Sequence, residues 1–114
     1  MRLLLILITF CVCQDQIDGQ SEPLVTTALG KIKGSVKSSL SGHHFLAFRG
    51  IRYANPPIGA LRFQDPVQVD SWDGIFDATH EGPTCMQFDG LTSKSIGTED
   101  CLVLSVYTRS VSHH

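Results

Sequence analysis

The sequence lacks every short motif by which hydrolases and nucleotide-binding proteins are usually identified. It has no GxSxG nucleophile elbow and no HGG oxyanion loop. It also has no HExxH motif, no P-loop and no GxGxxG ahead of a helix. The two histidine pairs, His43-His44 and His113-His114, are expected to be exposed to solvent and not bound to metal. The residues by themselves therefore offer no catalytic group, no metal site and no cofactor site.

A run of positive charge is also missing. The 114 residues contain 9 Lys and Arg against 11 Asp and Glu, for a net charge of −2, so a nucleic acid is not the expected partner. The charges are nevertheless segregated. Residues 21–63 hold six basic residues and one acid, Glu22, whereas residues 65–100 hold eight acids and one base, Lys94. The two halves either attract each other within one domain or carry solvated loop charges, and the sequence leaves both readings open.

No apolar run is long enough to span a bilayer, which takes about 20 residues. The one apolar run near the start extends from Leu3 to Cys13 and follows Arg2, a pattern typical of a secretory signal peptide. We expect residues 1–20 to be this leader, with cleavage between about residues 13 and 21. A signal anchor is the weaker alternative. The mature chain is then secreted and has no membrane span.

Cysteine is scarce, and two of the four, Cys11 and Cys13, leave with such a leader. The remaining pair, Cys85 and Cys101, is most simply a disulfide in an oxidising compartment. Closing a loop of about 15 residues contributes roughly 3 kcal/mol in chain-entropy models. The rival interpretation, half of a zinc site, lacks any CxxC or histidine spacing.

The rest of the chain is rich in strand and turn patterns. Residues 23–38 predict a hairpin around Ala28-Leu29-Gly30, followed by alternation of period two. Residues 43–50 predict a strand that is apolar on both faces and so lies inside a larger sheet. Residues 102–108 predict a last strand. Residues 53–85 are punctuated by proline and glycine and predict an ordered surface loop, pinned by Trp72, Phe76 and the disulfide.

Three linked motifs then indicate a family. The stretches FRGIRYANPPIGALRF, GPTCMQ and EDCLVLSVY, with W-D-G between the first two, resemble the N-terminus of the type-B carboxylesterase and cholinesterase family, especially secreted insect carboxylesterases of the juvenile hormone esterase-like group. The resemblance covers about residues 23–109. Arg52 departs from the pattern, because many members have a proline there.

The resemblance implies an α/β fold, of which this chain supplies the N-terminal, mainly antiparallel β edge of an α/β-hydrolase. Residues 21–114 are then an incomplete fragment of the carboxylesterase type-B domain. The strand at 102–108 is expected to be flanked by further sheet, so the chain is expected to be a truncated product, an incomplete gene model or a short splice form.

The resemblance also bears on particular residues. Family members bridge the cysteines that match Cys85 and Cys101. Arg62 and Glu99 match an arginine and a glutamate of the family and are candidates for a structural ion pair; the alternative is two exposed charges worth under about 1 kcal/mol. Phe88 is expected to anchor the disulfide loop, with the mouth of an active-site gorge as the alternative.

The implied chemistry is the hydrolysis of small-molecule carboxylic esters by a serine, a histidine and an acid, without a cofactor. All of these groups lie beyond the family's equivalent of Arg109, so no catalytic residue is assigned and the chain alone is expected to be inactive. The disulfide loop has no tryptophan, which disfavours a choline ester. The alternatives are a fragment of a non-catalytic adhesion-type relative or a short disulfide-stapled binding module. The oligomeric state is left open.

Overall fold

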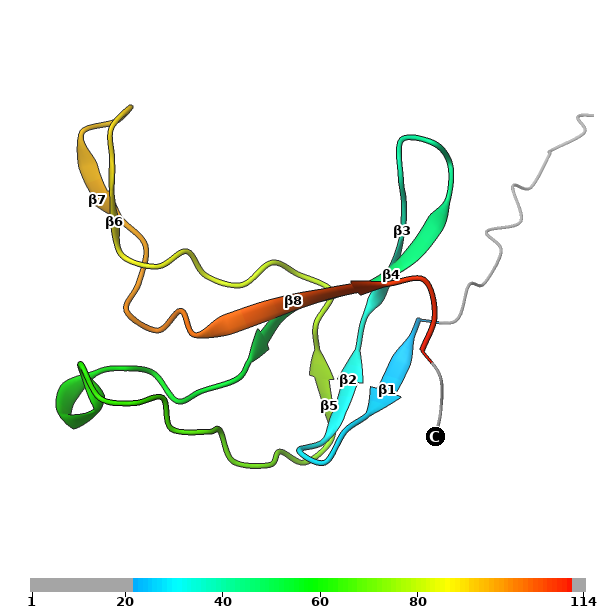
Figure 1. Ribbon diagram of the computed structural model, residues 1–114, viewed down its shortest axis with the longest axis horizontal. Helices are drawn as coiled ribbons and strands as arrows, with labels where there is room; N and C mark the ends of the chain where they lie inside the picture. Colours follow the sequence, from blue (N-terminus) through cyan, green and yellow to red (C-terminus); the bar gives the residue numbers. More distant parts are fainter. Residues whose placement is uncertain (1–21, 112–114) are drawn as a thin grey trace, which may run out of the picture.

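The computed structural model describes residues 22–111, and this part of the chain contains eight short strands and one 3-10 helix (Figure 1). The strands form two three-stranded sheets and one two-stranded hairpin. The expected leader, with Cys11 and Cys13, and the pair His113-His114 lie outside the described residues.

The first sheet has the order β1-β2-β5, with β1 at Leu24–Thr26, β2 at Lys31–Lys33 and β5 at Ile75–Asp77. Strands β1 and β2 are antiparallel. The turn between them is closed by Thr27, whose Oγ1 accepts hydrogen bonds from the backbone N–H groups of Leu29 and Gly30, both at 3.2 Å. The predicted hairpin at this place is confirmed.

Strand β5 corrects the expectation that residues 53–85 form only a surface loop. It runs parallel to β2, with Ile32 opposite Phe76. Three residues flanked by turn signals give too short a pattern to predict a strand, and the pairing is decided by contact with β2. The stretch between β4 and β5 is otherwise irregular, apart from the 3-10 helix at Gly59–Leu61.

The second sheet has the order β3-β4-β8 and is antiparallel throughout. It consists of β3 at Ser35–Ser38, β4 at His44–Arg52 and β8 at Val103–Thr108. Strand β4 is central, as its apolar residues on both faces predict. Ala47 and Phe48 in this strand are 0% and 4% exposed.

A bulge interrupts β4 between Phe48 and Ile51, where its register with β8 shifts. Gly50 has a φ of 67° there, and a Cβ on it would lie 3.1 Å from the carbonyl oxygen of His80. Only glycine suits this combination of a left-handed conformation and a close approach. The bulge lets the segment after β5 pass beside β4, where the N–H of Arg49 donates to the Ala78 carbonyl at 2.8 Å.

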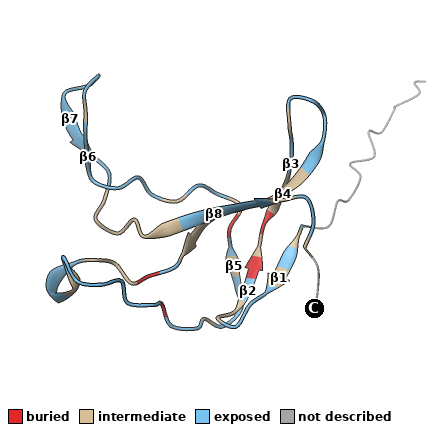
Figure 2. Ribbon diagram, viewed as in Figure 1, coloured by how far each residue is buried: buried red, intermediate tan, exposed pale blue. Residues whose placement is uncertain are grey.

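The apolar core is small and joins the two sheets. Its buried members, Ile32, Phe48 and Ala78, come from β2, β4 and the residue after β5. Trp72 packs against them, and its indole N–H donates to the Lys31 carbonyl at 3.1 Å. Figure 2 shows buried positions mainly where β2, β4 and β5 meet, whereas β6 and β7 are exposed. The packing role predicted for Trp72 is confirmed.

The third unit is an antiparallel hairpin of β6 at Gln87–Asp89 and β7 at Lys94–Ile96. It lies within the loop between Cys85 and Cys101 and projects away from the two sheets (Figure 1). Residues 86–97 are called the disulfide arm below. The sequence did not predict these strands, because residues 86–97 have no alternating apolar pattern.

Candidate functional site

The base of the disulfide arm is closed by covalent and backbone bonds together. Cys85 and Cys101 form a disulfide with a Cα–Cα distance of 5.1 Å, as the sequence predicts. Beside it, the N–H of Met86 donates to the Thr98 carbonyl at 3.1 Å, and the N–H of Thr98 donates to the Thr84 carbonyl at 2.9 Å. These bonds alone hold the two ends of the arm together, without a contact from any side chain outside the arm.

Gly97 makes this closure sterically feasible. Its φ is 98°, and a Cβ at this position would overlap the carbonyl of Cys85. A residue with a side chain would have to adopt a left-handed conformation and also push the backbone of the disulfide aside.

Arg62 and Glu99, which family resemblance names as candidates for an ion pair, lie within hydrogen-bonding distance. The Nη1 of Arg62 is 2.9 Å from Oε1 and 3.0 Å from Oε2 of Glu99. Their side chains are 55% and 38% exposed. At this exposure the pair contributes under about 1 kcal/mol, which corresponds to the exposed alternative. A structural role for the pair stays a prediction.

The next residue along the chain, Asp100, pairs with Arg52, and sequence reasoning missed this contact. Both guanidinium Nη atoms bind the carboxylate; Nη2 lies 2.9 Å from Oδ2. The hydrogen bonds and charge of Arg52 hold the pKa of Asp100 below its usual value, and those of Asp100 raise the pKa of Arg52. The one signal in the sequence was that Arg52 stands where many family members have a proline, because a proline could not form this two-nitrogen contact with a carboxylate.

Together the ion pairs show why the charge is segregated along the chain. Five occur within residues 22–111, and four of them join the basic half to the acidic half. The four are Lys33–Asp77, Arg49–Glu81, Arg52–Asp100 and Arg62–Glu99. The fifth, between Lys33 and Glu22, lies inside the basic half. Four of the eight acids of residues 65–100 therefore pair with the basic half and the other four are in none of these pairs, so each of the two open readings holds for part of the charge.

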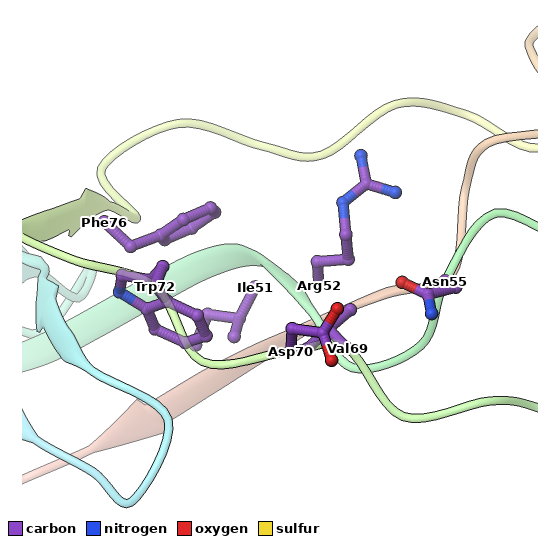
Figure 3. Close-up of a pocket in the computed structure, with 7 residues that line it drawn as sticks. All are labelled: Ile51, Arg52, Asn55, Val69, Asp70, Trp72 and Phe76. Atoms are coloured by element: carbon purple, nitrogen blue, oxygen red, sulfur yellow. The ribbon is translucent and has the colours of Figure 1, made fainter.

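A pocket of about 320 Å³ opens beside the ion pairs (Figure 3). Its apolar lining comes from Ile51, Val69, Trp72 and Phe76, and its polar residues are Arg52, Asn55 and Asp70. The guanidinium of Arg52 is directed away from Trp72 (Figure 3). The lining includes no serine, cysteine or histidine. The pocket can therefore hold an apolar group but offers none of the hydroxyl, thiol or imidazole groups of a nucleophilic triad.

Hydroxyl–imidazole contacts occur elsewhere, and their arrangement is unsuited to catalysis. Ser41 contacts His43 in the loop between β3 and β4, and Ser38 at the end of β3 contacts His44 at the start of β4, each at 3.0 Å and exposed. Thr79 contacts His80 at 2.9 Å, but its hydroxyl also donates to Asp77 at 2.7 Å. The carboxylate thus binds the hydroxyl and does not orient the imidazole, whereas a nucleophilic triad needs the reverse order.

Residues 22–111 contain no group of three or more His, Cys, Asp or Glu side chains placed to hold a metal ion. None of their helices is long and apolar enough to cross a membrane.

Phe88 is 68% exposed on the disulfide arm, so the expectation that it anchors the loop by burial is wrong for this chain. The arm is a two-stranded hairpin, and among the described strands β6 and β7 pair with each other alone. The gorge-mouth alternative for Phe88 stays a prediction.

Known proteins resemble this chain over most of its length. The carboxylesterase family model matches residues 21–113. The chain is 40% identical over 93 residues to a carboxylic ester hydrolase of Bombus ignitus. This match covers 77% of the chain and 17% of that protein. It is also 38% identical over 107 residues to Esterase E4 of Myzus persicae. This second match covers 93% of the chain and 19% of that protein.

A solved structure agrees with the sequence relatives. The juvenile hormone esterase of Manduca sexta, determined with OTFP covalently attached, matches with a TM-score of 0.67 at 33% identity over 77% of the chain. The match covers 17% of that enzyme, and the chain likewise spans under a fifth of the two esterases above. The chain belongs to the carboxylesterase family, and it forms part of the mainly antiparallel β edge of an α/β-hydrolase fold.

Proposed function

We propose that this chain is the N-terminal part of a secreted carboxylic ester hydrolase and that the 114 residues alone do not hydrolyse esters. The observation that carries the proposal is the family match over residues 21–113, together with a shared fold at a TM-score of 0.67. The matched relatives are named esterases, and they are about five times longer than the matched stretch.

The contribution of this chain to such an enzyme is structural. Ester hydrolysis in this class needs a serine nucleophile, a histidine base and oxyanion-hole donors, and the 114 residues contain no GxSxG or HGG motif to supply them. Strand β8, the edge strand of the β3-β4-β8 sheet, would offer the side along which the sheet that carries those groups continues. The substrate is a small-molecule ester, and the chemistry requires no cofactor.

Two features support secretion and a signal peptide at residues 1–20. The apolar run from Leu3 to Cys13 follows Arg2 and is too short to span a bilayer. The Cys85–Cys101 disulfide fits an oxidising compartment. N-terminal sequencing of the secreted product tests this directly, and a mature start outside residues 14–22 would contradict it.

The central test is to sequence the transcript beyond the codon for His114 and to assay the encoded product on 1-naphthyl acetate. An HGG-type loop followed by GxSxG, with activity in the long product and none in the 114-residue chain, supports the proposal. A substituted serine at the elbow would overturn it in favour of a non-catalytic adhesion-type relative. A stop codon directly after His114 would also overturn it, because the chain could then only bind.

A further inference from the structure

The disulfide arm is the least packed part of the described chain. Apart from the partly buried Asp89, all residues from 86 to 97 are exposed, and Phe88 and Leu91 are 68% and 98% exposed. A two-stranded hairpin without a packed face is marginally stable in water at best. The arm is therefore expected to open locally far more often than the sheets unfold.

The tip of the arm is held only by local contacts. The carboxylate of Asp89 accepts hydrogen bonds from the N–H of Leu91 at 3.0 Å and from the hydroxyl of Thr92 at 2.5 Å. Ser93 has a φ of 54°, a conformation that non-glycine residues rarely adopt. Lys94 follows as the first residue of β7, opposite Asp89 of β6, and it is the sole Lys or Arg between Arg62 and Arg109.

The other basic residues of the described chain up to Arg62 are placed less favourably for a protease. Arg62 is 55% exposed, but its guanidinium is bound to the Glu99 carboxylate. Trypsin-like enzymes require an accessible Lys or Arg in a segment that can be drawn into the extended conformation of the active-site cleft. Lys31 and Lys33 lie on the central strand β2, and Arg49 and Arg52 lie on the central strand β4. Lys37 lies on β3, which is hydrogen-bonded to β4 along its length.

We propose that the Lys94–Ser95 peptide bond is a processing site for a trypsin-like serine protease, and that cleavage yields a two-chain form of the protein. The reaction is hydrolysis: water adds across the C–N bond, leaving a carboxylate on Lys94 and an amine on Ser95. The two chains stay joined by Cys85–Cys101. The ion pairs of Glu99 and Asp100 lie outside the arm and also remain.

The position of Lys94 between Cys85 and Cys101 determines the effect of cleavage on the protein. A nick at Lys94 falls inside the covalent loop, so neither chain can leave without a reductant. The sheets keep all their pairings, because β8 follows Cys101 and β1 to β5 precede Cys85. Exposed tips of this kind are where proteolytic nicking and tolerance to change concentrate. The inference is independent of whether the protein hydrolyses esters.

The test uses the full chain, attached sparsely to streptavidin beads through a C-terminal biotin so that molecules cannot aggregate. The beads are treated briefly with dilute trypsin, washed in non-reducing guanidinium chloride, and then washed with dithiothreitol. A cut at Lys94 releases nothing in the first wash and releases the fragment ending at Lys94 in the second. A cut at Lys37 releases its fragment in the first wash, and a cut at Arg109 releases the whole protein there.

We expect the reductant-dependent fragment to form at least about tenfold faster than the Lys37 fragment, because cleavage follows the population of the open state. Lys94→Gln should abolish that fragment, whereas the matched control Lys37→Gln should leave its rate unchanged. Earlier cleavage at Lys37 or Arg62, release of the Lys94 fragment without reductant, or full resistance while the guanidinium-unfolded, washed chain is cut would each overturn the proposal.

Discussion

At the scale of the residue, the pair of Arg52 and Asp100 links stability to pH. The hydrogen bonds from Arg52 lower the pKa of Asp100 in the folded chain below the value of about 3.9 of an unperturbed aspartate. Because the pKa of Asp100 is lower in the folded chain, its contact with Arg52 stabilises the fold fully above about pH 3.9. This stabilisation is lost as the pH falls through the pKa of Asp100 in the folded chain.

We therefore expect Asp100→Asn to flatten the dependence of stability on pH below about pH 4. The measurement is urea unfolding at pH 6 and at pH 3, followed by the fluorescence of Trp72, the single tryptophan. Residual acid sensitivity should persist in the variant, because Thr79 and Thr92 lower the pKa of Asp77 and Asp89 in the same direction.

The matched control is Asp73→Asn, since the structure shows no ion pair for Asp73 among the described residues. This control should keep the acid sensitivity of the unsubstituted chain. Equal flattening by both substitutions would mean that the contact between Arg52 and Asp100 does not stabilise the fold.

Gly97 gives a second prediction at this scale. Gly97→Ala should cost about 1–3 kcal/mol of unfolding free energy, because alanine at a φ of 98° is strained and its Cβ would overlap the Cys85 carbonyl. Urea unfolding measures this cost, and thiol counting reports whether the disulfide still forms. Gly90→Ala is the control: a Cβ there meets nothing within 4 Å. A similar cost at both positions would contradict the steric argument.

At the scale of the element, the disulfide arm is tied to the sheets more firmly than it is packed. Replacing Cys85 and Cys101 together by serine should cost roughly 3 kcal/mol, the loop-closure value for a separation of this size. Glu99 and Asp100, which follow the arm, should nevertheless keep their positions, because their ion pairs with Arg62 and Arg52 do not involve the disulfide.

Amide hydrogen exchange of the double variant distinguishes the loss of stability in the arm from the retained structure of the segment that follows it. Protection should fall at residues 86–97 and persist at residues 103–108, which pair with β4. The unsubstituted chain under reducing conditions is the second sample and should behave like the double variant. Loss of protection in β8 as well would show that the disulfide holds the sheet itself.

At the scale of the whole molecule, the described residues bury little and expose much. Leu104, Val106 and Tyr107 of β8 are 41%, 44% and 57% exposed, and β8 is an edge strand whose outer side is unpaired within residues 22–111. An apolar groove of about 180 Å³ lies along it, lined among others by Phe48 and Val106. Exposed apolar faces beside an open strand edge favour association.

The 114-residue chain should therefore bind ANS and self-associate at micromolar concentration, as light scattering would report. Val106→Lys should reduce both effects several-fold, because a charge on an edge strand opposes pairing. Leu40→Lys is the control, since Leu40 is a fully exposed single residue on a turn and belongs to no apolar face. A chain that stays monomeric and unfolds cooperatively would contradict this prediction and favour a free-standing module.

The sequence by itself determined the features that depend on local pattern and on covalent chemistry. The hairpin around Ala28-Leu29-Gly30, the two-sided apolar strand β4 and the strand near residues 102–108 follow from period and turn residues. The disulfide follows from the only two cysteines beyond residue 13, and the family follows from three linked motifs.

Only the tertiary structure decided which distant residues meet. Strand β5 is three residues long and exists because it lies beside β2. The fork between Arg52 and Asp100 joins positions 48 residues apart, and no local pattern specifies which acid an arginine reaches. The exposure of Phe88 depends on what packs on the disulfide arm. Such contacts between distant residues depend on how the whole chain folds. No short stretch of sequence specifies them.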